Sequence, residues 1–197
     1  PPMIFAQLRK LMVARNCVGT DDVAGGYEAT RHLLDLGYRK VAYISGPEHW
    51  ASAAERLKGY KKALEDYGFP YDPSLVEFGD WEICSGTEAT HQLLNRHPEI
   101  DAIFVANDLM AAGCIQAAVS RGLHVPHDLA IVGYDDRYLA EALTPPLTSF
   151  AYPLNQMGQK AAHLLINRLL RRKARSVPSV TVAGNLVIRA SCGAMSS

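Results

Sequence analysis

Four apolar, β-rich runs that each end in a polar cluster limit what this chain can fold into more than any other feature. They are VAYISGP at 41–47, VEFGDW at 76–81, AIFVAND at 102–108 and AIVGYDD at 130–136. A helix-compatible segment follows each run, and this alternation predicts βαβ units in a doubly wound parallel sheet, an α/β fold. The polar ends should then meet along one edge of the sheet, where open α/β sheets bind ligands. We expect function at seven residues of that edge: Gly46, Asp80, Trp81, Asn107, Asp108, Asp135 and Asp136.

Helix start and stop signals divide the chain between the strands. Asp21 and Asp22 stand where N-caps belong, and Gly37 closes the helix that follows them. The pair Gly25–Gly26 inside that helix is expected to serve packing rather than phosphate binding. The other helices are expected at 51–67, 84–96, 108–121, 137–143 and 154–172. The strands are expected at 41–46, 76–80, 102–106, 129–134 and 149–152, with TVAGNLVIRAS as one closing strand at a sheet edge.

Composition and charge exclude several classes of function. The chain has 20 Lys and Arg against 20 Asp and Glu in 197 residues. It therefore has no overall field that would hold nucleic acid, and any action on DNA must come from another segment. No apolar stretch approaches the roughly 20 residues that span a bilayer, so we expect no membrane partner. With 48% hydrophobic residues, the chain can form one or two domains, each with a hydrophobic core.

The motifs of catalysis and metal binding are missing from the sequence. It has no G-x-G-x-x-G, Walker-type, G-x-S-x-G or H-E-x-x-H pattern. The seven histidines are scattered without partners at metal or triad spacing, and we expect them to be surface or locally bonded side chains. We expect the four cysteines to be free thiols in a reducing cytoplasm. They are Cys17, Cys84, Cys114 and Cys192. We therefore expect no metal, no cofactor and no catalytic residues.

A hydroxyl-rich small molecule suits the polar strand ends best. A carboxylate such as Asp135 accepts hydrogen bonds from neighbouring hydroxyls, and Asn107 can both donate and accept. Arg56 would add several fixed donors, and the face of Trp81 would cover the apolar side of a sugar or base. These four residues form the predicted binding set.

Each of these residues also has a purely structural interpretation. Asp108 and Asp136 precede helices, and the pattern favours a role as N-caps for both. Trp81 could fill the core, and Asp80 could be a turn residue. Arg56 could pair with an acidic neighbour, Glu55 or Glu82, on a solvated helix face.

Five motifs, in order along the chain, closely resemble the effector-binding region of lactose-repressor-type (LacI/GalR) bacterial transcription regulators. They are VGTDDVAGGYEATRHLLDLGYRKVAYISGP, ERLKGYKKALEDYG, FVANDLMAAGCIQAAVSRGLHVPHDLAIVGYDD, LTPPLTSF and LVIRAS. The resemblance runs from Val18 to Ser191. It implies a fold similar to periplasmic sugar-binding proteins, with two α/β subdomains and an effector in the cleft. Residues 21–150 and 182–192 would form the C-terminal subdomain, and 1–20 and 151–181 an incomplete remnant of the N-terminal one.

The resemblance also implies function and partners. Arg56, Trp81, Asn107 and Asp135 fall on effector-contacting positions, and Tyr152 and Leu154 on positions that line the cleft from the other side. The effector would be a sugar or a nucleoside-like molecule, and the protein a cytoplasmic regulator, a repressor, that catalyses no reaction. Operator DNA would be bound only through an N-terminal helix-turn-helix headpiece absent from this chain, which is expected to be a fragment.

Two questions stay open in the sequence. Members of the resembled family dimerise, and the apolar faces of 108–121 and Tyr138–Leu143 would lie at that contact, although such spacing is more often core. The chain could instead be a periplasmic sugar-binding protein of a transport system, or an α/β enzyme that uses Asp135 and Asp136. The unpaired cysteines and the missing catalytic group disfavour these two alternatives.

Overall fold

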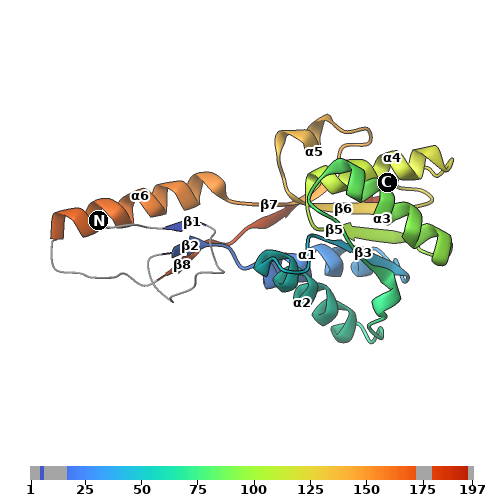
Figure 1. Cartoon of the computed structure of the whole chain (residues 1–197), viewed down its shortest axis with the longest axis horizontal. Helices are drawn as coiled ribbons and strands as arrows, with labels where there is room; N and C mark the ends of the chain where they lie inside the picture. Colours follow the sequence, from blue (N-terminus) through green and yellow to red (C-terminus); the bar gives the residue numbers. More distant parts are fainter. Residues whose placement is uncertain (1–4, 7–16, 172–178, 195–197) are drawn as a thin grey trace. The chain divides into compact units, whose positions relative to one another are not determined.

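The chain divides into two compact units in the computed structural model, which describes residues 5–6, 17–171 and 179–194 (Figure 1). The first unit comprises 1–21 and 152–184, and the second comprises 22–151 and 185–197. The alternating strands and helices predicted from the sequence lie in the second unit, so that unit carries the candidate ligand-binding edge.

The second unit is built on a six-stranded sheet in the order β4-β3-β5-β6-β7-β9. Five strands run parallel, and β9 pairs antiparallel with β7 at one edge. The prediction of an α/β fold with a mostly parallel sheet is confirmed. The strands are β3 (Val41–Ser45), β4 (Val76–Phe78), β5 (Ala102–Val105), β6 (Ala130–Asp135), β7 (Thr148–Ala151) and β9 (Asn185–Val187).

The strand order reverses beside β3, at the kind of switch point where open α/β sheets commonly bind ligands. The chain passes from β3 outward to β4 and then returns to the other side of β3 to form β5. Crossover connections that leave in opposite directions open a crevice outside the carboxyl ends of β3 and β5. Those ends carry Gly46 and Asn107.

Helices cover both faces of this sheet. In Figure 1, α1 (Asp22–Asp35) and α2 (Ala51–Asp66) lie together on one face, and α3 (Ile83–Arg96) and α4 (Asp108–Ser120) lie together on the other. The short α5 (Tyr138–Ala142) follows β6, while the 3-10 helices η2 (Pro73–Leu75) and η3 (Ala190–Cys192) lie in connections. Glycines with positive φ follow α1, α2 and α4, as the stop signals predicted, and they are Gly37, Gly68 and Gly122.

A row of aromatic rings crosses the centre of the sheet on the α1 and α2 face. Tyr43 stacks on Phe104 with ring centroids 4.9 Å apart, and Tyr134 stacks on Phe150 at the same distance. Tyr60 of α2 stacks on Tyr43 at 5.3 Å and donates its hydroxyl hydrogen to the carbonyl of Val41. The row therefore fixes α2 above β3, and with it the helix that carries Arg56.

Glycines let the helices on this face approach the sheet and each other closely. A Cβ atom on Gly25 would overlap the Tyr134 ring, and one on Gly26 would overlap the Arg56 backbone. Gly59 of α2 faces the α1 backbone in the same way. The expectation that Gly25–Gly26 serves packing is confirmed.

The end of the chain differs from the prediction of one closing strand. TVAGNLVIRAS begins in β8 (Val180–Thr181) of the first unit and continues in β9 of the second unit. Val182 still donates its N–H to the carbonyl of Gly19 at 2.8 Å, so the chain leaves the first unit only after this bond. The prediction of a single strand was wrong because the apolar pattern gives strand character without saying which sheet the residues join.

The first unit contains a parallel sheet in the order β1-β2-β8, with β1 (Phe5–Ala6) and β2 (Cys17–Gly19), and the long helix α6 (Leu154–Arg171). Met157 of α6 is buried, whereas Ile166, Leu169 and Leu170 are exposed. Within the described residues, no helix is both long enough and apolar enough to cross a membrane.

The close packing of α1 on α2 gives a stability prediction. Gly26→Ala should destabilise the protein by about 1 to 3 kcal/mol, because the added methyl group forces the two helices apart. Urea unfolding followed by circular dichroism measures the change. Gly158→Ala is the matched control in α6, where a Cβ atom meets nothing within 4 Å, and it should stabilise by about 0.5 to 1 kcal/mol. Equal effects of the two substitutions would contradict the packing role.

Candidate functional site

The carboxyl edge of the six-stranded sheet brings together four of the six residues predicted to bind a ligand. Asn107 follows β5, Asp135 ends β6, Trp81 follows β4, and Arg56 reaches the edge from α2. Arg56 lies 3.9 Å from the Asp135 carboxylate and 5.7 Å from the centre of the Trp81 ring. The sequence therefore places complementary polar and aromatic groups at the crevice that the strand order opens.

Arg56 is the buried centre of the site, with 3% of its surface exposed. Its Nε donates to Asp22 Oδ1 at 3.1 Å, and its Nη1 donates to the carbonyl of Ala106. The guanidinium lies 3.6 Å from the centre of the Tyr134 ring, a cation–π contact. The alternative of a solvated helix face is wrong, because this side chain is buried and bonded inside the unit.

Charges around Arg56 keep it ionised despite its burial. Burial alone would lower the pKa of Arg56, but the nearby Tyr134, Asp22 and Asp135 more than offset this and raise the pKa overall. Asp22 also accepts a hydrogen bond from the Tyr134 hydroxyl at 3.1 Å. The cation is thus held by α1, the end of β5 and β6 at once.

Asp135 has acceptor capacity left for a ligand. Its side chain is 25% exposed, and it lies at an ion-pair distance of 3.9 Å from Arg56. Burial raises the pKa of the Asp135 carboxyl, although the nearby Arg56 and Arg137 oppose the shift. Ligand hydroxyls that donate to this carboxylate would relieve the cost of its burial.

Backbone geometry at this edge is strained. Asp135 and Asp136 have φ values of 104° and 52°, in the left-handed region that side chains rarely adopt. Such residues persist only where surrounding contacts hold them, and they concentrate at binding sites.

Asp108 and Asp136 supply that support instead of capping helices. The N-cap of α4 is Asn107, and the N-cap of α5 is Arg137, so the N-cap interpretation was wrong for both aspartates. Asp108 accepts hydrogen bonds from the backbone N–H of Arg137 at 2.7 Å and from the Ser149 hydroxyl at 2.6 Å. Asp136 pairs with Arg189 at 2.6 Å. Together these contacts fix the turn that follows Asp135.

Asn107 uses both ends of its amide within the protein. Its Oδ1 accepts from the backbone N–H of Met110 at 2.9 Å, which caps α4, and its Nδ2 donates to the carbonyl of Trp81 at 2.9 Å. The second amide hydrogen remains for a ligand. Asn107 therefore also holds the loop that carries Trp81.

Trp81 lies over the end of β3 and has a φ of 77°. Its indole occupies the space that a side chain at Gly46 would need, so Gly46 is required for the ring to lie there. The indole N–H is buried and has no hydrogen-bond partner in the described part of the chain.

Asp80 accepts a hydrogen bond from the N–H of Glu82 at 3.0 Å, which confirms its interpretation as a turn residue.

Three further residues of this edge were missed from the sequence. In the sequence, Asp22 has a sufficient role at a helix start, and nothing in GYDD marks Tyr134 as a site residue. Trp50 lies at the start of α2, five residues after the end of β3, is 50% exposed, and has its ring centre 5.9 Å from that of Trp81. An aromatic residue in the loop after a strand was the available signal, as it was for Trp81.

Tyr152 and Leu154 belong to the first unit. Tyr152 is 8% exposed and Leu154 is 54% exposed. Their predicted role opposite the edge stays a prediction.

Three histidines outside the edge make local polar contacts. His32 contacts the Cys192 sulfur at 3.3 Å, His97 contacts the Ser74 hydroxyl at 2.9 Å, and His124 contacts Asp128 at 2.9 Å. The four cysteines are free thiols. In the ranges that the structure describes, no group of three or more His, Cys, Asp and Glu residues is arranged to hold a metal ion.

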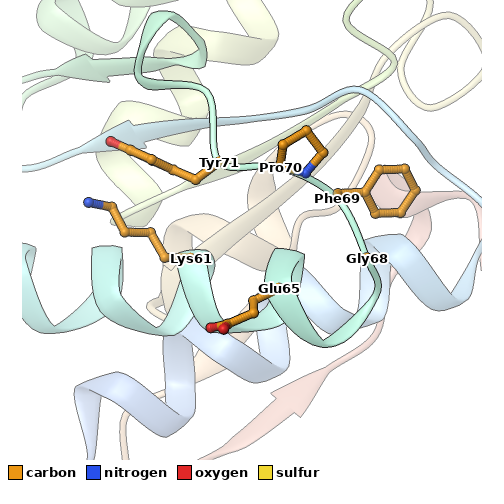
Figure 2. Close-up of a pocket in the computed structure, with 6 residues that line it drawn as sticks. All are labelled: Lys61, Glu65, Gly68, Phe69, Pro70 and Tyr71. Atoms are coloured by element: carbon orange, nitrogen blue, oxygen red, sulfur yellow. The ribbon is translucent and has the colours of Figure 1, made fainter.

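A depression of about 490 Å³ lies near the C-terminal end of α2, and Figure 2 shows the residues that line it. The Lys61 ammonium lies 4.0 Å from the centre of the Tyr71 ring, so its charge is already engaged. None of the predicted site residues lines this depression, whose lining is Lys61, Glu65, Gly68, Phe69, Pro70 and Tyr71.

Comparison with known proteins identifies the class to which this fold and edge belong. The model of the periplasmic binding protein-like domain matches residues 30–192. The chain therefore belongs to the periplasmic binding protein-like domain family, in the branch represented by LacI-family regulators.

Named relatives are transcription regulators. The HTH-type transcriptional regulator CelR of Thermobifida fusca is 42% identical over 152 residues, 77% of this chain and 45% of that protein. DegA of Bacillus subtilis is 38% identical over 188 residues, 95% of this chain and 55% of that protein. The chain thus spans about half the length of these curated relatives.

Solved structures agree with this assignment. The CelR–cellobiose complex superimposes with a TM-score of 0.90 at 37% identity, over 96% of this chain and 58% of that one. A LacI-family regulator from Enterococcus faecium with bound ribose gives 0.87 at 30% identity, over 96% and 70%. The resemblance proposed from the motifs is confirmed. The relatives are regulators rather than enzymes, which supports the expectation that the chain is not an enzyme.

The buried Asp108 gives a prediction for stability against pH. Burial raises the pKa of its carboxyl to about 7, although hydrogen bonds from Ser149 and Arg137 oppose the shift. The unfolded value is about 3.9, so the folded state binds more protons between the two values. This residue's contribution should therefore make the free energy of unfolding fall as pH rises from about 4 to 7.

Asp108→Asn should remove that slope. The melting temperatures of the variant and the wild type are measured at several pH values. The melting temperature of the variant should rise relative to that of the wild type as pH increases towards 7. Asp80→Asn is the control, because hydrogen bonds from Ser85 and the Glu82 backbone lower the pKa of Asp80 and its contribution runs in the opposite direction. Parallel curves for the wild type and Asp108→Asn would show that Asp108 does not titrate in this window.

Proposed function

We propose that this chain is the effector-binding region of a DNA-binding transcription regulator, a repressor, and that a saccharide binds at the carboxyl edge of the six-stranded sheet. The observation that carries the proposal is the grouping of Arg56, Asp135 and Trp81 at the switch point of the strand order. Relatives solved with cellobiose and with ribose support a sugar as the effector.

The chemistry of the site fits neighbouring hydroxyl groups. Asp135 would accept hydrogen bonds from two hydroxyls of one ring, while Arg56 fixes the orientation of the carboxylate by charge. The indole of Trp81 would cover the apolar C–H face of the ring. Asn107 would contribute its remaining amide hydrogen, and Tyr152 and Leu154 would line the opposite side of the bound effector.

The two units correspond, in this proposal, to the two subdomains of such a regulator. Residues 22–151 and 185–194 would form most of the C-terminal subdomain, and the described parts of the first unit would belong to the N-terminal one. Operator DNA would be bound only by a helix-turn-helix segment outside this chain, in a cytoplasmic homodimer whose symmetry matches the operator.

Effector binding would control DNA binding by linkage. A saccharide that prefers one orientation of the two subdomains must shift the protein towards it, and the affinity for operator DNA changes by the same coupling free energy. The transport-protein alternative predicts saccharide binding without any effect on DNA. Fluorescence anisotropy distinguishes the regulator from the transport protein. It measures binding of the intact protein to its own promoter DNA, with and without cellobiose, ribose and adenosine. Loss or gain of DNA affinity with a sugar supports the regulator, whereas no DNA binding under any condition refutes it.

The Asp135 carboxylate gives the sharpest test of the site. Asp135→Ala should weaken saccharide binding by ten- to a hundredfold or more, because each hydroxyl left without its acceptor costs about 1 to 3 kcal/mol. Isothermal titration calorimetry on the intact protein measures the change. Asp128→Ala is the matched control, since Asp128 is an exposed carboxylate that bonds His124 away from the edge. An unchanged affinity of the Asp135 variant would remove this residue from the site.

A further inference from the structure

Trp50 lies at a position where its side chain has no evident role in helix capping. It is the N-cap residue of α2 and makes no side-chain capping bond. N-cap positions favour Ser, Thr, Asp and Asn, whose oxygens accept from the first helical N–H groups. Half of the Trp50 surface is exposed, although tryptophan is mostly buried in folded proteins. Neither helix capping nor core packing therefore accounts for this residue.

The backbone holds Trp50 in a fixed place. Its N–H donates to the carbonyl of Pro47 at 3.0 Å, and its carbonyl accepts from Ala54 at 3.1 Å in the first turn of α2. The tight turn after β3 therefore presents the indole at the carboxyl edge of the sheet. A side chain on an already ordered backbone loses less entropy when it binds a ligand.

The indole of Trp50 extends the aromatic surface that begins with Trp81. The two rings meet edge to face, with centroids 5.9 Å apart and an interplanar angle of 73°. Trp81 in turn lies 5.7 Å from the Arg56 guanidinium. The polar groups that would bind one sugar ring therefore adjoin one indole, and the second indole adjoins the first.

We propose that Trp50 provides a second aromatic platform and that the effector is a saccharide of at least two rings. The first ring would contact Asp135, Arg56 and Trp81, and the next ring would lie against Trp50. Trp50 would act mainly through its apolar ring surface, so it would select ligand length more than hydroxyl pattern. This inference rests on the function proposed above.

The experiment compares ligand lengths on the intact wild-type protein by isothermal titration calorimetry. The probes are the disaccharides cellobiose, maltose and xylobiose, and their constituent monosaccharides glucose and xylose. At least one disaccharide should bind ten times more tightly than its monosaccharide. Equal affinities, or a preference for the monosaccharides, would overturn the inference.

Substitutions then assign the difference to Trp50. Trp50→Ala should weaken binding of the preferred disaccharide at least tenfold and change monosaccharide binding less than twofold. Trp50→Phe keeps an aromatic ring, so its disaccharide affinity should stay within threefold of the wild type. Leu36→Ala is the matched control, because Leu36 is 40% exposed just beyond the end of α1 and away from the site. Unchanged disaccharide binding by Trp50→Ala would overturn the inference.

The same data separate this inference from the proposed function. If Trp50→Ala has no effect but Asp135→Ala still abolishes sugar binding, the proposed function stands and only the second platform falls. If no saccharide binds the wild type, both fall.

Discussion

The buried guanidinium of Arg56 is the interaction on which the carboxyl edge depends. A charge with 3% exposure is costly unless it is paired and hydrogen-bonded, so its partners cannot move independently. Those partners are Asp22 at the start of α1, the carbonyl of Ala106 after β5, and the ring of Tyr134 in β6. One side chain of α2 thus ties three other elements together where a ligand would bind, and leaves Asp135 as the acceptor that faces outward.

The packing beneath the site serves the same arrangement. Gly26 and Gly59 allow α1 and α2 to approach closely enough for Arg56 and Asp22 to meet, and Gly25 leaves room for Tyr134 between α1 and the sheet. On the other side of Asp135, Asp108 and Ser149 hold the turn that its positive φ requires. The strained backbone at Asp135 is therefore supported by buried hydrogen bonds, which is how a site is preorganised for its ligand.

Much of this was predictable from the sequence, and the failures have physical reasons. Strand and helix periodicity with glycine stop signals located the elements, and the polar strand ends located Trp81, Asn107 and Asp135. Arg56 was predicted from its donor chemistry and from the ERLKGY motif of the resembled family. An Asn-Asp pair before a helix does not say which residue caps it, and here Asn107 rather than Asp108 is the N-cap. Asp22 was overlooked because an aspartate at a helix start has a sufficient local explanation, whereas its partner Arg56 is 34 residues away. Sheet membership of TVAGNLVIRAS depends on pairings between distant strands, which local pattern does not contain.

A crystal structure of the intact protein with its tightest-binding saccharide tests the central claim most directly. The account predicts difference density at the carboxyl ends of β3, β5 and β6, with a sugar hydroxyl within hydrogen-bond distance of Asp135 and a ring face against Trp81. Arg56 should keep its bonds to Asp22 and Ala106 in that complex. Density for the sugar elsewhere, with the Asp135 carboxylate facing solvent, would contradict the account.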